Sequence, residues 1–130
     1  MDTKVLVDVD ISQGERLLHA LDEAGIVIRS ALWFYLEESA EWRLILATPL
    51  VNVHGPKKAY EKVQEVLKSL EAKGEPLDIH LWQISLVSPE DTLVKHLRGA
   101  VKAEGISRVR VSGSSVNGLY VDDALVYRLT

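Results

Sequence analysis

The chain has 130 residues, of which 47% are hydrophobic and 26% charged, and its formal charge is -4 at pH 7. This length suits one domain, residues 1–130, and the average composition argues against disorder or a fibrous repeat. The chain has no cysteine, which excludes disulfides, a thiolate nucleophile and sulfur-based zinc sites. Its acidic balance argues against nucleic acid as a partner, because binding to phosphate depends on clustered Lys and Arg.

The first residues carry no export or membrane signal. From Met1 to Asp8 the chain reaches an acidic residue after only three apolar ones, so it lacks the apolar core of a secretion signal. No apolar run approaches the roughly 20 residues that a membrane span requires. We therefore expect a cytoplasmic protein with no membrane partner.

A helix is predicted over residues 12–24. Ser12 followed by Glu15 makes a capping-box pattern, and Leu17, Leu18 and Leu21 then recur at helical spacing before Gly25.

A β-hairpin is predicted next. Residues 26–37 and 42–51 are rich in β-branched and aromatic side chains, and residues 38–41 read as a turn. A two-residue turn at Ser39-Ala40 would set Phe34 opposite Ile45 on one face. The other face would then carry an aromatic and aliphatic surface made by Trp33, Tyr35 and Trp42.

That second apolar face needs a cover, because a half-exposed antiparallel sheet normally alternates apolar and polar side chains. A helix, a second copy of the chain or a ligand would each provide one, and the sequence leaves these three alternatives open.

The rest of the chain completes an α+β pattern. Gly55-Pro56 opens a helix that Lys73-Gly74 closes, residues 77–87 alternate as a strand, and residues 88–91 begin a third helix that ends at Gly105. A second hairpin follows over residues 106–130. The predicted fold is a mixed or antiparallel sheet of about five strands with three helices, in the order α-β-β-α-β-α-β-β.

The second hairpin turns at Asn117-Gly118, a dipeptide typical of two-residue primed turns. This register places Val109 opposite Val126 and Val111 opposite Ala124. Either both faces of this hairpin are covered, or Asp122-Asp123 forms a bulge.

Acidic pairs near the two ends suggest a rival, enzymatic reading. Asp8 and Asp10 follow a strand-like apolar run that includes Val7, as in metal-dependent phosphoryl-transfer enzymes, and Asp122 with Asp123 could join them around a divalent cation. The plainer interpretation is that Asp10 complements a helix dipole. In the same interpretation, the later pair faces Ser112 and Gly113 beside Arg110, as a surface charge pair or bulge.

Two further residues complete the candidate binding set. His54 lies in the polar connection from Asn52 to Gly55, where functional groups often project, and Arg43 follows Trp42 in the first hairpin. The four histidines include no pair at helical metal-binding spacing, and no cofactor fingerprint is present, so we expect no cofactor.

Several segments carry a resemblance. They are Ala31-Leu32-Trp33-Phe34-Tyr35, Trp42 to Val51, Gly55-Pro56 with Ala59-Tyr60, and Asn117-Gly118 to Arg128. With these segments the chain resembles a family of short bacterial proteins of unknown function. The resemblance covers nearly the whole chain and implies a bacterial source and a self-contained domain, with no activity, cofactor or catalytic residue attached.

The sequence thus favours a small non-enzymatic binding or assembly protein that forms a homodimer. The aromatic face of the first hairpin and the connection around His54 would supply its contacts. The rival is a divalent-metal-dependent hydrolase or phosphoryl-transfer enzyme that uses the four aspartates.

Overall fold

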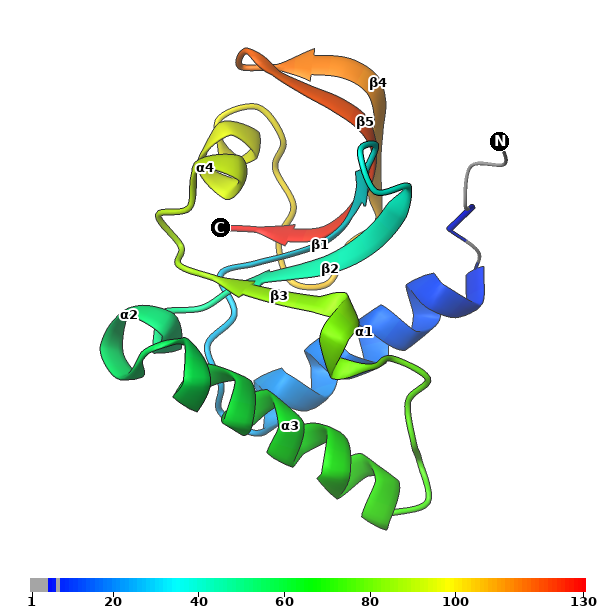
Figure 1. Ribbon diagram of the computed structural model, residues 1–130, viewed down its shortest axis with the longest axis vertical. Helices are drawn as coiled ribbons and strands as arrows, with labels where there is room; N and C mark the ends of the chain where they lie inside the picture. Colours follow the sequence, from blue (N-terminus) through cyan, green and yellow to red (C-terminus); the bar gives the residue numbers. More distant parts are fainter. Residues whose placement is uncertain (1–4, 7) are drawn as a thin grey trace.

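The computed structural model describes residues 5–6 and 8–130 and has an α+β fold (Figure 1). The predicted order of elements is confirmed, with one short helix added. In chain order the elements are α1 (Asp8–Glu23), β1 (Ser30–Leu36), β2 (Glu41–Ala47), α2 (Leu50–His54), α3 (Pro56–Ala72), β3 (Ile84–Val87), α4 (Thr92–Arg98), β4 (Val109–Val116) and β5 (Leu119–Leu129).

The sheet has five strands in the order β3-β2-β1-β5-β4. β2 and β3 pair in parallel, and the other neighbours pair antiparallel, so the sheet is mixed. β1 is central, and its ladders with β2 and β5 join the two hairpins into one layer. Within the described residues, no helix is long and apolar enough to cross a membrane.

Helices cover both faces of this sheet (Figure 1). On one face α1 and α3 pack over Trp33, Tyr35 and Trp42, which are 2%, 6% and 6% exposed. On the other face Val94 and Leu97 of α4 pack in a second apolar cluster with residues of β1, β2 and β5. Of the three covers considered for the aromatic face, the structure therefore has the helix.

A buried hydrogen-bond network joins α1 to the sheet. The Tyr127 hydroxyl accepts a bond from Trp33 Nε1 at 2.9 Å and donates one to the Ile11 carbonyl at 2.6 Å. Gly14 makes room for this network, because a Cβ at that position would overlap the Tyr127 hydroxyl and lie 2.8 Å from Trp33 Nε1. The helix thus approaches the sheet as closely as a glycine allows.

α1 begins earlier than predicted. Ser12 lies inside the helix rather than at its cap, and Asp8 and Asp10 occupy its first turn. The rival interpretation, in which both aspartates follow a strand, is therefore wrong, and Asp10 lies near a helix amino terminus as in the plainer interpretation. Val7, which belonged to the predicted strand-like run, lies outside the described residues.

The two hairpins differ in how well the sequence placed them. In the second, Val109 pairs with Val126 and Val111 with Ala124, as predicted from the two-residue turn. In the first, β1 ends at Leu36 and β2 begins at Glu41, so four residues connect them and Phe34 pairs with Arg43 instead of Ile45. This shift of two residues keeps every side chain on its predicted face.

Other boundaries also moved. β2 ends at Ala47, and the chain then forms α2, where a longer strand to Val51 had been predicted. The alternating run 77–87 yields only the four residues of β3, preceded by a 3-10 turn at Leu81–Gln83. α4 is capped by Asp91, whose carboxylate accepts from the Leu93 amide, and it ends at Arg98 rather than near Gly105.

A side chain forms hydrogen bonds with the outward-facing backbone groups of the short edge strand β3. In a parallel ladder every second residue of a strand directs its backbone N–H and C=O toward the same neighbouring strand. The Val87 carbonyl accepts a bond from the Thr48 amide, so it points toward β2. Ile84 and Leu86 therefore direct theirs outward. The Tyr60 hydroxyl of α3 donates to the Ile84 carbonyl at 3.3 Å and accepts from the Leu86 amide at 3.1 Å.

Candidate functional site

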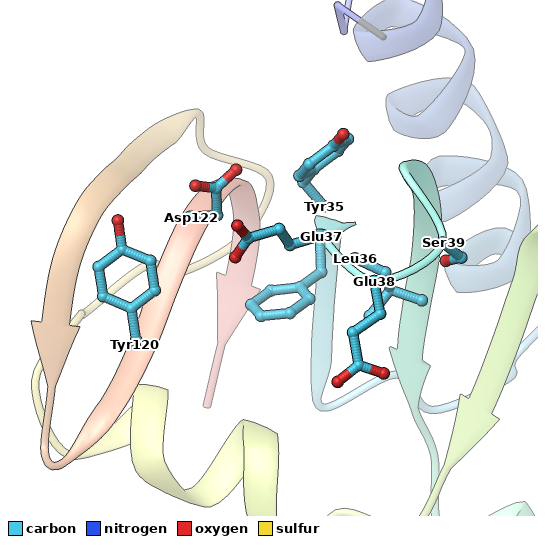
Figure 2. Close-up of a pocket in the computed structure, with 8 residues that line it drawn as sticks. Tyr35, Leu36, Glu37, Glu38, Ser39, Tyr120 and Asp122 are labelled. Atoms are coloured by element: carbon cyan, nitrogen blue, oxygen red, sulfur yellow. The ribbon is translucent and has the colours of Figure 1, made fainter. Parts of the chain in front are cut away.

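A cleft opens where the first hairpin turns. It has a volume of about 480 Å³. We call it the turn cleft, and its lining residues are Phe34, Tyr35, Leu36, Glu37, Glu38, Ser39, Tyr120 and Asp122. The end of β1 and the four-residue connection form one side, and β5 forms the other. Figure 2 shows Glu37 and Asp122 pointing into the space between these elements, with the Tyr120 ring beside them.

The charged side chains described in the turn cleft all have the same sign. Within the part of the chain that the structure describes, its lining includes three carboxylates, from Glu37, Glu38 and Asp122, and no basic side chain. Phe34 contributes an aromatic ring that is 9% exposed, whereas Tyr120 is 57% exposed. A large aromatic side chain left this open at the mouth of a cleft offers contact area with no rearrangement of the core.

The two neighbouring aspartates of β5 have different surroundings. Asp123 accepts a bidentate bond from Arg110 at 2.7 and 2.6 Å, which is the surface charge pair predicted from the register. That bond holds the pKa of the Arg110 guanidinium above its ordinary value. Arg110 also lies 5.8 Å from the centroid of the Trp42 ring, on the α1 side of the sheet. Asp122 lines the turn cleft instead.

The predicted metal site is not assembled from the described residues. Among them, no group of three or more His, Cys, Asp or Glu side chains is placed to hold a metal ion. Asp122 lines the turn cleft, whereas the Asp123 carboxylate is bound by Arg110. Asp8 and Asp10 lie in the first turn of α1, near enough to Arg108 and Tyr127 respectively to act on them electrostatically.

The predicted binding residues are distributed over different places. Trp33 and Trp42 belong to the core under α1, which removes the aromatic face as a free surface. Tyr35, although 6% exposed, reaches the turn cleft. Arg43 donates to Ser85 Oγ at 2.7 Å and lies 3.7 Å from a Glu41 carboxylate oxygen, so it braces the β2–β3 edge.

His54 lines a second hollow, on the other side of the molecule from the hairpin turn. This hollow, which we call the valine groove, has a volume of about 500 Å³ and is lined by Ala24, Gly25, Ile26, Val27, Thr48, Pro49, Leu50, Val53, His54, Lys62, Glu65 and Val66. Its walls include Val27 and Val53, which are 54% and 71% exposed.

Sequence reasoning missed several exposed residues. Glu37 and Glu38 form an acidic doublet where an apolar strand meets its turn, and Tyr120 follows the Asn117-Gly118 turn. The sequence pattern assigns Glu37 and Tyr120 to strands and Glu38 to a turn, which does not mark them as site residues. Trp82 is 64% exposed and stacks on His80 with ring centroids 6.0 Å apart. It had been assigned to a strand, where a tryptophan is an ordinary core residue.

No protein-family model, curated protein or solved structure matches this chain.

Proposed function

We propose that this chain is a non-enzymatic binding protein and that the turn cleft holds a positively charged organic group, such as an alkylammonium or a guanidinium. The single observation that carries the proposal is the lining of the cleft. Three carboxylates and three aromatic rings line it, and no basic side chain is among the described residues of the lining.

The charge of the cleft favours a cation. Among the described residues, the charged side chains that line it are all acidic, and Arg110, the cation of the neighbouring strand, is bound to Asp123. A ligand cation would therefore meet attraction without a competing internal partner. Low-dielectric walls strengthen such attraction relative to open solvent.

The aromatic rings favour an organic cation over a bare metal ion. Ammonium and guanidinium groups are attracted to the face of Tyr or Phe within about 6 Å of the ring centroid. A hard metal ion instead requires several carboxylate oxygens at short range around one point. The described residues hold no such group of three. Carboxylates that are spread apart beside aromatic rings therefore suit an organic cation better than a metal ion.

The proposal also retains part of what the sequence suggested. A binding role was expected from the first hairpin, and Tyr35 remains in the candidate site, now together with Asp122. The contact surface moves from the face of the hairpin, which α1 covers, to its turn end.

The test is a titration followed by backbone amide NMR, with n-butylammonium and agmatine as probes and n-butanol as the neutral control. We expect saturable shifts confined to residues 34–39 and 120–122 with both cations and none with butanol. Asp122→Asn and Glu37→Gln should each weaken binding roughly two- to fivefold, the range of one partly exposed charge contact.

Glu71→Gln on α3 is the matched control, because it makes the same change in net charge outside the cleft. It should bind the probes as the wild type does. Equal weakening by Glu71→Gln, or equal shifts with butanol, would show that the turn cleft has no selective cation site.

A further inference from the structure

We propose that the valine groove is the surface through which two copies of this chain associate. The proposal is independent of the turn cleft, which lies at the other end of the first hairpin. It rests on the exposure of the groove's walls, on the continuity of its floor with the core and on the signs of the charges at its rim.

The walls of the groove are two exposed valines that the fold brings together. Val27 follows Gly25, whose φ of 78° lets the chain turn at the end of α1, and Val53 lies in α2, 26 positions further along. They are 54% and 71% exposed, although both belong to the lining of one hollow. Scattered exposed valines need no explanation, but a pair that walls an apolar hollow indicates a contact surface.

The floor of the groove is continuous with the main core. Ile26 and Leu50 are partly buried and pack against the apolar cluster under α1 and α3. Val66 of α3, at 9% exposed, belongs to that cluster and also lines the groove. An apolar side chain from outside would therefore lie against ordered core residues, which gives a contact of the packed kind found at the centre of interfaces.

The rim of the groove carries both signs of charge. Lys62 and Glu65 are exposed residues of α3 and line the groove three positions apart. In a two-fold symmetric contact the same patch occurs on both copies. A contact between one residue of the first copy and another residue of the second copy therefore occurs twice. Lys62 of one copy can then face Glu65 of the other, twice, with no repulsion between like charges.

This mixed rim selects a second copy as the occupant. The charged residues described in the turn cleft are all acidic, so two such clefts would repel each other. The valine groove combines an apolar centre with one cation and one anion from a single helix, which is complementary to itself. Charge complementarity of this kind sets the partner and the register of an interface.

The first test measures the solution mass by sedimentation velocity over a concentration series of the full chain. We expect the wild type to dimerise and Val53→Asp to raise the dimer dissociation constant at least tenfold. Val9→Asp is the matched control, because Val9 is an exposed valine of α1 that does not line the groove. It should dimerise as the wild type does.

The second test uses charge reversal. Lys62→Glu and Glu65→Lys should each weaken the homodimer, because each variant presents a rim of one sign. An equimolar mixture of the two should associate again as a heterodimer, and the double variant should associate with itself. Circular dichroism would confirm that each variant is folded.

A wild type that stays monomeric at the highest concentration would overturn the proposal. So would an equal effect of Val9→Asp, or a mixture of the two single variants that remains monomeric.

Discussion

The Tyr127 hydroxyl on β5 donates a 2.6 Å hydrogen bond to the backbone carbonyl of Ile11 in α1, a residue 116 positions earlier in the chain. The same oxygen accepts from Trp33 Nε1, so one atom links a helix and two strands. Burial is the main cause that raises the pKa of this phenol well above its ordinary value of 10.0. The hydroxyl therefore keeps the proton that it donates.

Removing this oxygen should destabilise the protein. Tyr127→Phe leaves the buried Trp33 indole N–H without its acceptor, at an expected cost of about 1–3 kcal/mol in the free energy of unfolding. Urea denaturation would measure it. Tyr120→Phe removes a hydroxyl from an exposed ring and should change stability little. Equal stability of Tyr127→Phe and wild type would mean that packing alone holds α1 in place.

Gly14→Ala should destabilise the protein even though alanine is the better helix former by about 1 kcal/mol. The added Cβ would overlap the Tyr127 hydroxyl and lie 2.8 Å from Trp33 Nε1, so α1 would have to lift from the sheet. Overpacking of this kind costs about 1–3 kcal/mol. Thermal denaturation would show whether the substitution lowers the melting temperature, as we expect, or raises it.

A double variant, Gly14→Ala with Tyr127→Phe, tests whether a steric clash causes the loss of stability in Gly14→Ala. Tyr127→Phe takes away the nearest atom, so Gly14→Ala should lose part of its cost in that background. Additive effects of the two substitutions would contradict a direct clash between these residues.

Tyr60→Phe should open the edge strand β3. The Leu86 amide would lose its hydroxyl acceptor and the Ile84 carbonyl would keep its bond from Arg43, and an edge with an unpaired amide invites association with other chains. We expect faster hydrogen exchange at the Leu86 amide and more aggregation on mild heating. Exchange at the Leu32 amide, in the central strand β1, should stay as in the wild type. Unchanged exchange at Leu86 would show that Tyr60 does not protect this edge.

Stability should depend on pH through Glu15. Its hydrogen bonds from Arg108, at 2.9 and 2.6 Å, hold the pKa of the Glu15 carboxyl below the ordinary value of 4.5. A lowered pKa in the folded state means that the unfolded chain binds the proton more readily. The contribution is therefore complete above pH 4.5 and is lost as the pH falls through the folded-state value.

Glu15→Gln should accordingly lower the urea midpoint at neutral pH and show a weaker loss of stability on acidification. Glu71→Gln, on the exposed side of α3, should keep the wild-type dependence. A Glu15→Gln protein with the full acid dependence would assign that dependence to other carboxylates.

The sequence predicted the fold best where a local rule fixes long-range geometry. Asn117-Gly118 permits a two-residue turn, and that turn sets the register of Val109 against Val126. The first hairpin has no such dipeptide. Ala40, in the connection of this hairpin, adopts a φ of 52°, and a positive φ is not predicted for an alanine. The faces were still correct, because the apolar pattern fixes the side of each residue even when the register moves by two.

Other features depend on contacts that no local pattern encodes. The parallel pairing of β2 with β3 requires the chain to pass through α3 first, and α2 forms in a segment whose apolar run resembles a strand. The turn cleft joins Glu37 to Asp122 only because β5 lies beside β1 in the sheet. Burial of Trp33 under α1 could not be read from the hairpin itself.

Asp122 and Asp123 show how strictly the length of β5 is constrained. One lines the turn cleft and the other binds Arg110, although they are adjacent. A single residue inserted between Asp123 and Ala124 would move Asp123 out of line with Arg110 and shift Asp122 relative to the turn cleft. Many substitutions in this strand can be absorbed by repacking, but a change of one residue in its length would alter the fold and the cleft together.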